Sequence, residues 1–583
     1  MREWTKSAST LLLGFSLWVV CFFTYLSNLP TTYTYDGMVF STKIESAHVP
    51  LRYIFPPHHL LYNLLGRTLF FWGRAHGASW DGLVALQFFD ILTGALGAVL
   101  AFHLLVRETN DRLIAFFSAV GLSFTFSYWY FSTSPGVRIF ATVTPLLVWY
   151  LLTYLKKETP PAFGLVLGFA HALAVLGHQT NLLLTPAFIG AIFLSDKKKW
   201  EKLKTFVYYL FALTAGALGP YVFIGRYIWQ KETYEKWLWW FFAYLHVKQW
   251  GGNLQSAGFE EGKAAMVKAF LSKSHAADTL AASLTFGAAK ILFQFTILAI
   301  LCLFLLRFKW LWKEHRQSFF IGLFWLLAFV PFFVWWEPWN IEFWVASTVP
   351  CWILMGLIVA DLSDRWKNPV LRFANRSFVL CLWGFLIGLL FLFNFKNPVK
   401  KTAIIHSPKE ILAALDWKVR VDDLVILTGI NTVPFYIDRY QKRDYLSLDM
   451  FFKKYEKTDE SNNDLKVKKE KDEIQPKPDP WADLAELFTK VWRRHRKVWV
   501  LTEVADENES WNLKFENFLK IPRGQTSSFF HQYQLNPVSY HHQVFFYEIV
   551  KPTPTPTPVL EVTPVPAQTS PTDKKGNKKG KSS

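Results

Sequence analysis

Cysteine is scarce in this chain, and charge is absent from long parts of it. The four cysteines, Cys21, Cys302, Cys351 and Cys381, all fall inside apolar runs, so they predict packing residues rather than a disulfide framework. Glycine-rich loops of the GxGxxG or Walker type are also absent, which argues against a nucleotide site. The sequence shows no convincing internal repeat.

The uncharged stretches predict a membrane protein. Hydrophobic residues make up 51% of the sequence, and uncharged runs of roughly 17 to 24 residues recur from Ser9 to Phe395, long enough to cross a hydrocarbon core about 30 Å thick. The expected spans lie near residues 9–27, 83–106, 113–131, 139–155, 162–177, 182–195, 205–224, 286–306, 318–336, 343–360 and 377–395. We therefore predict a polytopic α-helical membrane protein with about eleven transmembrane helices, the first of them retained rather than removed as a signal peptide.

Basic residues indicate the orientation of these spans. The net charge of +18 comes mainly from short loops between alternate runs and from the tail, as the positive-inside rule requires, so we expect no nucleic-acid partner. The segment from His58 to Phe71 would invert this pattern if it crossed, and we place it as an interfacial or re-entrant helix on the outer side. The pattern predicts a bacterial-type plasma-membrane protein with a cytoplasmic N-terminus and an extracytoplasmic C-terminus.

Composition divides the chain into three parts. A membrane module is expected over residues 1–395, with outer segments at 28–82 and 225–282. Residues 396–550 are predicted to form an extracytoplasmic α/β domain. Its β-rich runs are Leu424–Leu427, Val498–Leu501 and Val544–Ile549, and a charged insertion that is expected to be mobile lies at 453–480. The last residues, 551–583, are rich first in Pro and Thr and then in Lys, and are expected to be disordered.

The first outer segment contains the motif that carries a family resemblance. Asp36 follows the first apolar run, and a Pro-Pro pair followed by His58 and His59, with Tyr62 close behind, precedes the second. This order resembles the first outer loop of GT-C glycosyltransferases, including the protein O-mannosyltransferase-like and lipid A aminoarabinose transferase-like families. The resemblance covers the membrane module as topology and only short stretches as motif.

The resemblance implies roles for these residues. In those families the loop acid deprotonates or orients the acceptor, which implies that role for Asp36, and the His/Pro segment borders the substrate. Several relatives carry a second acidic motif at the outer end of the third span, where this sequence has Ser134-Pro135-Gly136-Val137-Arg138. No metal-binding acid pair is therefore predicted, and the participation of a divalent metal stays open.

The chemistry of sugar transfer requires the same types of groups. Moving a sugar from a polyprenyl phosphate to a hydroxyl needs a base near the acceptor oxygen and cations near the departing phosphate. Asp36 is the candidate base, although an aspartate there would also cap the short helix expected to follow. Glu45 is interpreted as a solvated helix residue. His58 and His59 point different ways if they lie on a helix, so at most one of them is expected to face the site.

Polar groups at the ends of later spans extend the candidate site. Arg138 would clamp a lipid phosphate bidentately, or alternatively reach for headgroups. His178, Gln179 and Asn181 interrupt two apolar runs, and they either line the cavity or form an ordinary outer turn.

A Trp-rich turn from Trp335 to Trp344 holds two carboxylates, Glu337 and Glu342, with Asn340 between them. We predict that these three residues contact the sugar or lipid phosphate, because aromatic faces stack on sugars. The alternative is an aromatic belt around a capped helix start.

Together these residues predict a GT-C-like glycosyltransferase that uses a polyprenyl-phosphate-linked sugar as donor and an extracytoplasmic acceptor, among membrane lipids, with inversion at the anomeric carbon. Two alternatives remain. A transporter or flippase of lipid-linked sugars would show inverted repeats and helices broken at mid-membrane. A non-catalytic scaffold for envelope polymers would place Asp36 and Glu337 far apart.

Overall fold

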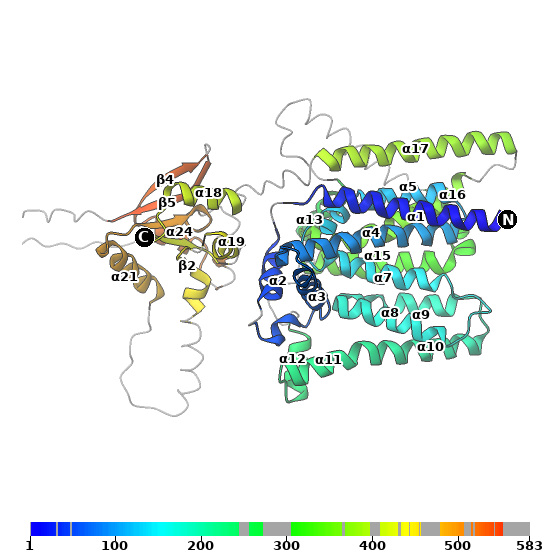
Figure 1. Ribbon diagram of the computed structural model, residues 1–583, viewed down its shortest axis with the longest axis horizontal. Coiled ribbons are helices and arrows are strands. Elements are labelled where there is room, and N and C mark those ends of the chain that lie inside the picture. Colours follow the sequence, from blue (N-terminus) through cyan, green and yellow to red (C-terminus); the bar gives the residue numbers. More distant parts are fainter. Residues whose placement is uncertain are drawn as a thin grey trace, which may run out of the picture.

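The computed structural model describes residues 2–30, 33–46, 49–243, 256–271, 303, 305–363, 368–396, 408–429, 433–441, 443–453, 455, 479–506, 515–516, 519, 521–540 and 543–551. A bundle of helices forms one end of the molecule, and a smaller domain with a β-sheet forms the other (Figure 1). Most of the charged insertion and nearly all of the Pro/Thr- and Lys-rich tail lie outside the described residues.

Six described helices are long and apolar enough to cross a membrane. Five of them are single helices: α1 (Arg2–Leu26), α4 (Gly82–Thr109), α15 (Arg316–Trp336), α16 (Ile341–Ser363) and α17 (Pro369–Lys396). The sixth is one continuous helix made of four consecutive elements: α10 (Lys199–Leu213), η3 (Thr214–Leu218), α11 (Gly219–Phe223) and η4 (Ile224–Ile228). A seventh span results if α5 (Arg112–Ser123) and α6 (Phe126–Thr133), which meet at 64°, are one broken helix. The protein is therefore a multi-pass membrane protein.

The count of eleven spans is not confirmed by the described residues. Three further apolar helices are shorter: α7 (Arg138–Leu152), α8 (Phe163–Gly177) and the pair η2 (Gln179–Leu184) with α9 (Thr185–Leu194). The predicted span at 286–306 lies almost wholly outside the described residues.

The break between α5 and α6 frees backbone carbonyls inside the bundle, and side chains from other helices bond to them. The Tyr25 hydroxyl donates to the Ser123 carbonyl at 2.8 Å, and the Asn394 amide donates to the Phe124 carbonyl at 2.8 Å. Because water is excluded from a membrane interior, such carbonyls need partners within the protein. The bend is thus built into the packing of α1, α5 and α17.

Two short helices of the first outer segment lie together at the end of the bundle nearest the sheet domain (Figure 1). These are α2 (Tyr35–Glu45) and α3 (Tyr62–Ala75), joined through the 3₁₀ turn η1 (Leu51–Ile54). The helix predicted from His58 begins only at Tyr62, so His58 and His59 lie in the turn before it. The premise that both histidines sit on one helix was wrong.

The second outer segment is described in part. It contains α12 (Tyr234–Phe241) and α13 (Ser256–Phe270), and α13 packs against α16, α6 and α15. Trp240 of α12 is buried against Tyr221 of α11, with ring centroids 6.2 Å apart. This tryptophan therefore fixes α12 to the end of a membrane helix.

The C-terminal domain holds a five-stranded mixed sheet in the order β2-β1-β3-β5-β4. Its strands are β1 (Leu424–Leu427), β2 (Tyr445–Ser447), β3 (Val498–Leu501), β4 (Gln534–Tyr540) and β5 (Gln543–Val550). Strand β1 runs parallel to β2 and β3, and β5 runs antiparallel to β3 and β4. The three predicted β-rich runs are strands β1, β3 and β5, whereas β2 and β4 were not predicted.

Helices cover both faces of this sheet, as expected for an α/β domain whose central strands are apolar throughout. They are α18 (Pro408–Lys418), α19 (Val433–Tyr440), α21 (Pro480–Arg493), α22 (Thr502–Ala505) and α24 (Gln525–Phe530). One apolar cluster joins the sheet to α18 and α19, and another joins it to α21 and α24. The first cluster also includes Met38 of α2 and Leu83 of α4, which are almost fully buried.

The sheet domain contacts the first outer segment through α19. The Tyr33 backbone N–H donates to the Tyr436 hydroxyl at 2.8 Å. Arg439 lies between two carboxylates, 2.8 Å from Glu45 Oε1 and 2.7 Å from Asp81 Oδ2. Glu45 also accepts the backbone N–H of Gly82. The interpretation of Glu45 as a merely solvated residue was wrong, because its carboxylate joins α2 to α4 and α19.

Candidate functional site

Asp36 lies in the first turn of α2, with a half-buried side chain. The cap of this helix is Thr34, whose hydroxyl accepts the Gly37 backbone N–H at 3.1 Å. The alternative that Asp36 caps the helix is therefore wrong. Within the described part of the chain, the Asp36 carboxylate forms no hydrogen bond or ion pair, so its oxygens are available to another molecule.

The electrostatic surroundings of Asp36 combine burial with two cations. Burial raises the pKa of the Asp36 carboxyl above its ordinary value of 3.8, while Arg138 and Lys43 oppose the rise. Lys43 lies seven residues further along α2, two turns away on the same face. Burial lowers the pKa of Lys43, and the Asp36 carboxylate raises it. A carboxylate held in this way is suited to accept a proton.

The loop that carries Arg138 packs directly against the start of α2. A Cβ atom on Gly37 would lie only 2.6 Å from the Pro135 carbonyl oxygen, so only glycine allows this approach. The Gly136 backbone N–H donates to the Tyr62 hydroxyl at 2.8 Å and lies 3.2 Å from Asp90 Oδ2. The Tyr62 hydroxyl in turn donates to Asp90 at 2.8 Å. Tyr62 thus positions the loop between α6 and α7.

Asp90 was not identified from the sequence, although a signal existed. It is the single acid between Gly82 and Val106, and an ionisable residue within an apolar span is by default a functional candidate. In the structure it is buried in α4 and supports Gly136. Asp90 therefore contacts the backbone of the segment 134–138 from a different helix.

Arg138 begins α7 and is held by three side chains. Its Nε lies 3.3 Å from Glu342 Oε2, and one terminal nitrogen lies 3.3 Å from His178 Nε2. The guanidinium also lies 4.2 Å from the centroid of the Phe343 ring. Arg138 is only 15% exposed, so the alternative of an arginine that reaches for headgroups does not describe it. The structure brings Arg138, His178 and Glu342 together from three helical segments.

The two adjacent histidines occupy different environments. The His58 ring lies 6.1 Å from the His178 ring, and burial together with Arg138 lowers the pKa of His58 to about 3. His59 is fully buried against Phe40, with ring centroids 4.7 Å apart, and burial lowers its pKa far below the ordinary value. His58 is therefore the neutral histidine on the Arg138 side, and His59 belongs to the packing under α2.

Gln179 and Asn181 bond to the backbone of neighbouring segments. The Gln179 amide donates to the Phe241 carbonyl at 3.0 Å. The Asn181 amide donates to the carbonyls of Ala141 and Ala174, at 3.0 and 2.9 Å. These contacts use the amide donors to join α7, α8 and α12, so both residues position the helices that flank Arg138.

The Trp-rich turn connects α15 to α16. Glu337 ends α15, and its carboxylate accepts the Asn340 amide at 2.8 Å. The Asn340 side-chain oxygen accepts the Glu342 backbone N–H at 3.1 Å. Glu337 and Asn340 therefore shape the turn that presents Glu342 to Arg138. Glu342 lies within electrostatic range of Asp36 as well as of Glu337 and Arg138.

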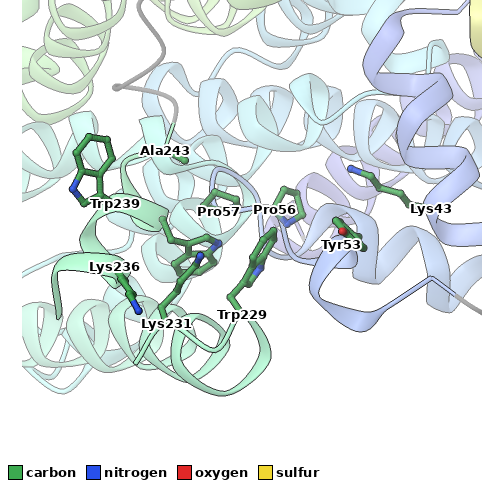
Figure 2. Close-up of a pocket in the computed structure, with 10 residues that line it drawn as sticks. Lys43, Tyr53, Pro56, Pro57, Trp229, Lys231, Lys236, Trp239 and Ala243 are labelled. Atoms are coloured by element: carbon green, nitrogen blue, oxygen red, sulfur yellow. The ribbon is translucent and has the colours of Figure 1, made fainter. Parts of the chain in front are cut away.

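A pocket of about 630 Å³ is lined by residues of the first and second outer segments (Figure 2). It runs between the first outer segment, which supplies Lys43 and Tyr53, and the segment around α12, which supplies Lys231, Lys236 and Trp239. Its lysines were overlooked in the sequence because single lysines near apolar runs are common at membrane interfaces. The described residues contain no group of three or more metal-ligating His, Cys, Asp or Glu side chains.

Comparison with known proteins gives one sequence-family match and several structural matches. The family model described as dolichyl-phosphate-mannose-protein mannosyltransferase matches residues 79–224. No curated protein sequence matches the chain.

The structural matches cover nearly the whole chain. The crystal structure of ArnT from Cupriavidus metallidurans bound to undecaprenyl phosphate is similar with a TM-score of 0.52 at 11% identity, over 93% of this chain and 98% of that one. The apo state of the same ArnT gives a TM-score of 0.51 at the same identity and coverage. At this level of identity, these likenesses concern the fold alone. The protein thus has the fold of the GT-C membrane glycosyltransferases.

Proposed function

We propose that this protein is a glycosyltransferase that moves a sugar from a polyprenyl-phosphate-linked donor to an acceptor outside the cytoplasm. The observation that carries the proposal is the Asp36 carboxylate, which has no partner among the described residues and shares its surroundings with Arg138, Lys43 and Glu342. The mannosyltransferase family match and the undecaprenyl phosphate bound to ArnT support the choice of donor.

The proposed reaction is a single displacement. The acceptor oxygen attacks the anomeric carbon of the sugar while its proton passes to Asp36, which acts as general base. The bond from the anomeric carbon to the phosphate oxygen breaks, and the polyprenyl phosphate leaves with the electron pair. Arg138, oriented by Glu342 and by the Nε2 atom of His178, stabilises the charge that develops on this phosphate, with neutral His58 as hydrogen-bond donor. One displacement inverts the anomeric centre.

The proposed location follows from the same topology. With the basic loops in the cytoplasm, α2, α3 and the sheet domain face the outside of a bacterial-type plasma membrane. The N-terminus then lies inside the cell and the C-terminus outside. The domain boundaries that we propose are a membrane module over 1–395 and an outer α/β domain over 396–550.

The break between α5 and α6 bears on the transporter alternative. A transporter would use unwound backbone at the break to bind its cargo. Here the carbonyls of Ser123 and Phe124 are occupied by Tyr25 and Asn394. The bend therefore supports packing of the bundle, and it gives no reason to prefer a transporter.

The decisive test is Asp36→Asn in protein reconstituted into liposomes with a polyprenyl-phosphate-linked sugar and a cell-envelope extract as acceptor. We expect transfer to fall by on the order of 10²- to 10⁴-fold, because an amide cannot accept the proton. The control is Asp422→Asn, which removes an exposed carboxylate of the sheet domain whose partner among the described residues is the exposed Arg420. Unchanged transfer by the Asp36 variant would refute the proposal.

A further inference from the structure

The pocket in Figure 2 has three lysines in its lining and no acidic residue. Lys43 comes from α2, Lys231 follows η4, and Lys236 lies in α12. None of them forms an ion pair within the described residues. Glu232 and Glu235 belong to the same segment, but their side chains are exposed and lie outside the lining. The lining formed by the described residues is therefore electropositive.

Aromatic rings form the walls between these lysines. The ring centroids of Tyr53 and Trp229 are 6.2 Å apart, and the Trp229 indole N–H is fixed by the Phe55 carbonyl at 2.8 Å. Trp240, in the last turn of α12, is buried, while Trp239 is 61% exposed. Fixed and exposed aromatic faces of this kind bind the C–H surfaces of sugars. The pocket thus combines the chemistry that recognises sugar with the charge that recognises an anion.

Lys43 connects this pocket to the proposed base. It lines the cavity and also lies on the same face of α2 as Asp36. The negative charge of Asp36 raises the pKa of Lys43. Asp36, Arg138 and His178 do not line the pocket. Asp36 lies two helical turns from Lys43, so a molecule seated in the pocket would have to extend past Lys43 to reach the proposed base, and it would leave the phosphate position beside Arg138 free.

We infer that this pocket binds the acceptor, and that the acceptor is an anionic saccharide carrying carboxylate or phosphate groups. The inference rests on the proposed transferase function, since it names the class of substrate that brings the hydroxyl to Asp36. A volume of about 630 Å³ is that of a pocket for a ligand of a few hundred daltons. The half-buried Lys43 and Lys231 would bind its charges inside the cavity, and the exposed Lys236 would bind them at its mouth.

The test is direct binding to the full chain in nanodiscs of neutral phospholipid. The probes are a uronic-acid trisaccharide, a phosphorylated trisaccharide, the uncharged trisaccharide of the same linkage, and undecaprenyl phosphate. The variant Lys231→Gln/Lys236→Gln removes two of the pocket lysines. Its control, Lys263→Gln/Lys268→Gln, removes two exposed lysines from α13, outside the pocket.

We expect one or both acidic trisaccharides to bind the wild type more tightly than the uncharged one, with binding that weakens as salt rises. The pocket variant should lose about tenfold or more in affinity for the acidic probe, and the control less than about twofold. Affinity for undecaprenyl phosphate should be equal in all three proteins.

Equal binding of charged and uncharged trisaccharides would overturn the inference. A loss of undecaprenyl phosphate affinity in the pocket variant would also overturn it, by assigning the pocket to the donor. Neither result depends on turnover, so failure here is distinct from failure of the Asp36→Asn test, which addresses the transferase function itself.

Discussion

Lys43 is, after Arg138, the second of two cations that lower the pKa of the proposed base. Because its positive charge lowers the pKa of Asp36 against the effect of burial, removing that charge should raise this pKa further. Asp36 must be ionised to act as base, so activity should increase as the pH rises through its pKa and be lost below it. The pH below which kcat/KM falls should accordingly lie above 3.8, the ordinary pKa of an aspartate.

We predict that Lys43→Gln moves the pH below which kcat/KM falls to a higher value. Profiles measured from pH 4 to 8 for the wild type and the variant would show the shift. Lys268→Gln, on α13, serves as control and should leave this pH unchanged. An unchanged value in the Lys43 variant would mean that another group controls it.

Helix α2 and the loop before α7 meet at one glycine. Gly37→Ala would place a methyl group 2.6 Å from the Pro135 carbonyl oxygen, so either the helix or the loop must move. Alanine also stabilises a helix relative to glycine by up to about 1 kcal/mol, which offsets part of the cost of this contact, so we expect the variant to fold. This movement would displace Asp36 in α2 or the loop that leads to Arg138.

We expect Gly37→Ala to lower kcat by roughly 10- to 100-fold while the protein unfolds at nearly the same temperature. The matched control is Gly388→Ala in α17, where a Cβ would meet no atom within 4 Å. Thermal unfolding followed beside turnover separates the two effects. Full activity of the Gly37 variant would show that the spacing between α2 and this loop has no role in the reaction.

At the scale of the whole molecule, Arg439 joins the sheet domain to the membrane module. It is 15% exposed and bonds to Glu45 of α2 and to Asp81 at the start of α4. Removing it would leave two carboxylates close together without their cation. Arg439→Ala should therefore weaken the docking of α19 by about 1–3 kcal/mol.

Hydrogen exchange of the amides in α2 would report this loosening, and exchange over 35–45 should become faster in Arg439→Ala. Arg420→Ala is the control, because the Arg420 side chain is 75% exposed and its ion pair, among the residues that the structure describes, is with Asp422 of the same domain. Transfer activity should fall along with protection. Unchanged exchange in α2 would mean that apolar contacts such as those of Met38 hold the domain without the arginine.

The sequence predicted those parts of the molecule that depend on local pattern. Apolar runs identify the long helices, and the three most apolar strands stand out by composition alone. Strand β2 has only three residues and β4 contains a proline, so neither gives a clear strand signal. The sequence also identifies Asp36, Arg138 and Glu342 as candidate site residues, because a charged side chain near the membrane interior costs free energy.

The remaining features depend on contacts between residues far apart in the chain, which one sequence does not reveal. Arg439 and Glu45 are separated by 394 positions, and Tyr33 and Tyr436 by 403. Glu45 looked solvated because its partners lie in α19 and α4. The lysine pocket was not predicted either, because its two walls come from outer segments that are far apart in the sequence.

The bond between Asp90 and Gly136 fixes one half of the site to the interior of the bundle, whereas α2 is fastened at its far end to the sheet domain. Helix α2 is thus fastened twice, to α4 through Glu45 and Gly82 and to the sheet domain through Arg439. The position of the proposed base therefore depends on a domain that lies outside the helical bundle as well as on the bundle itself.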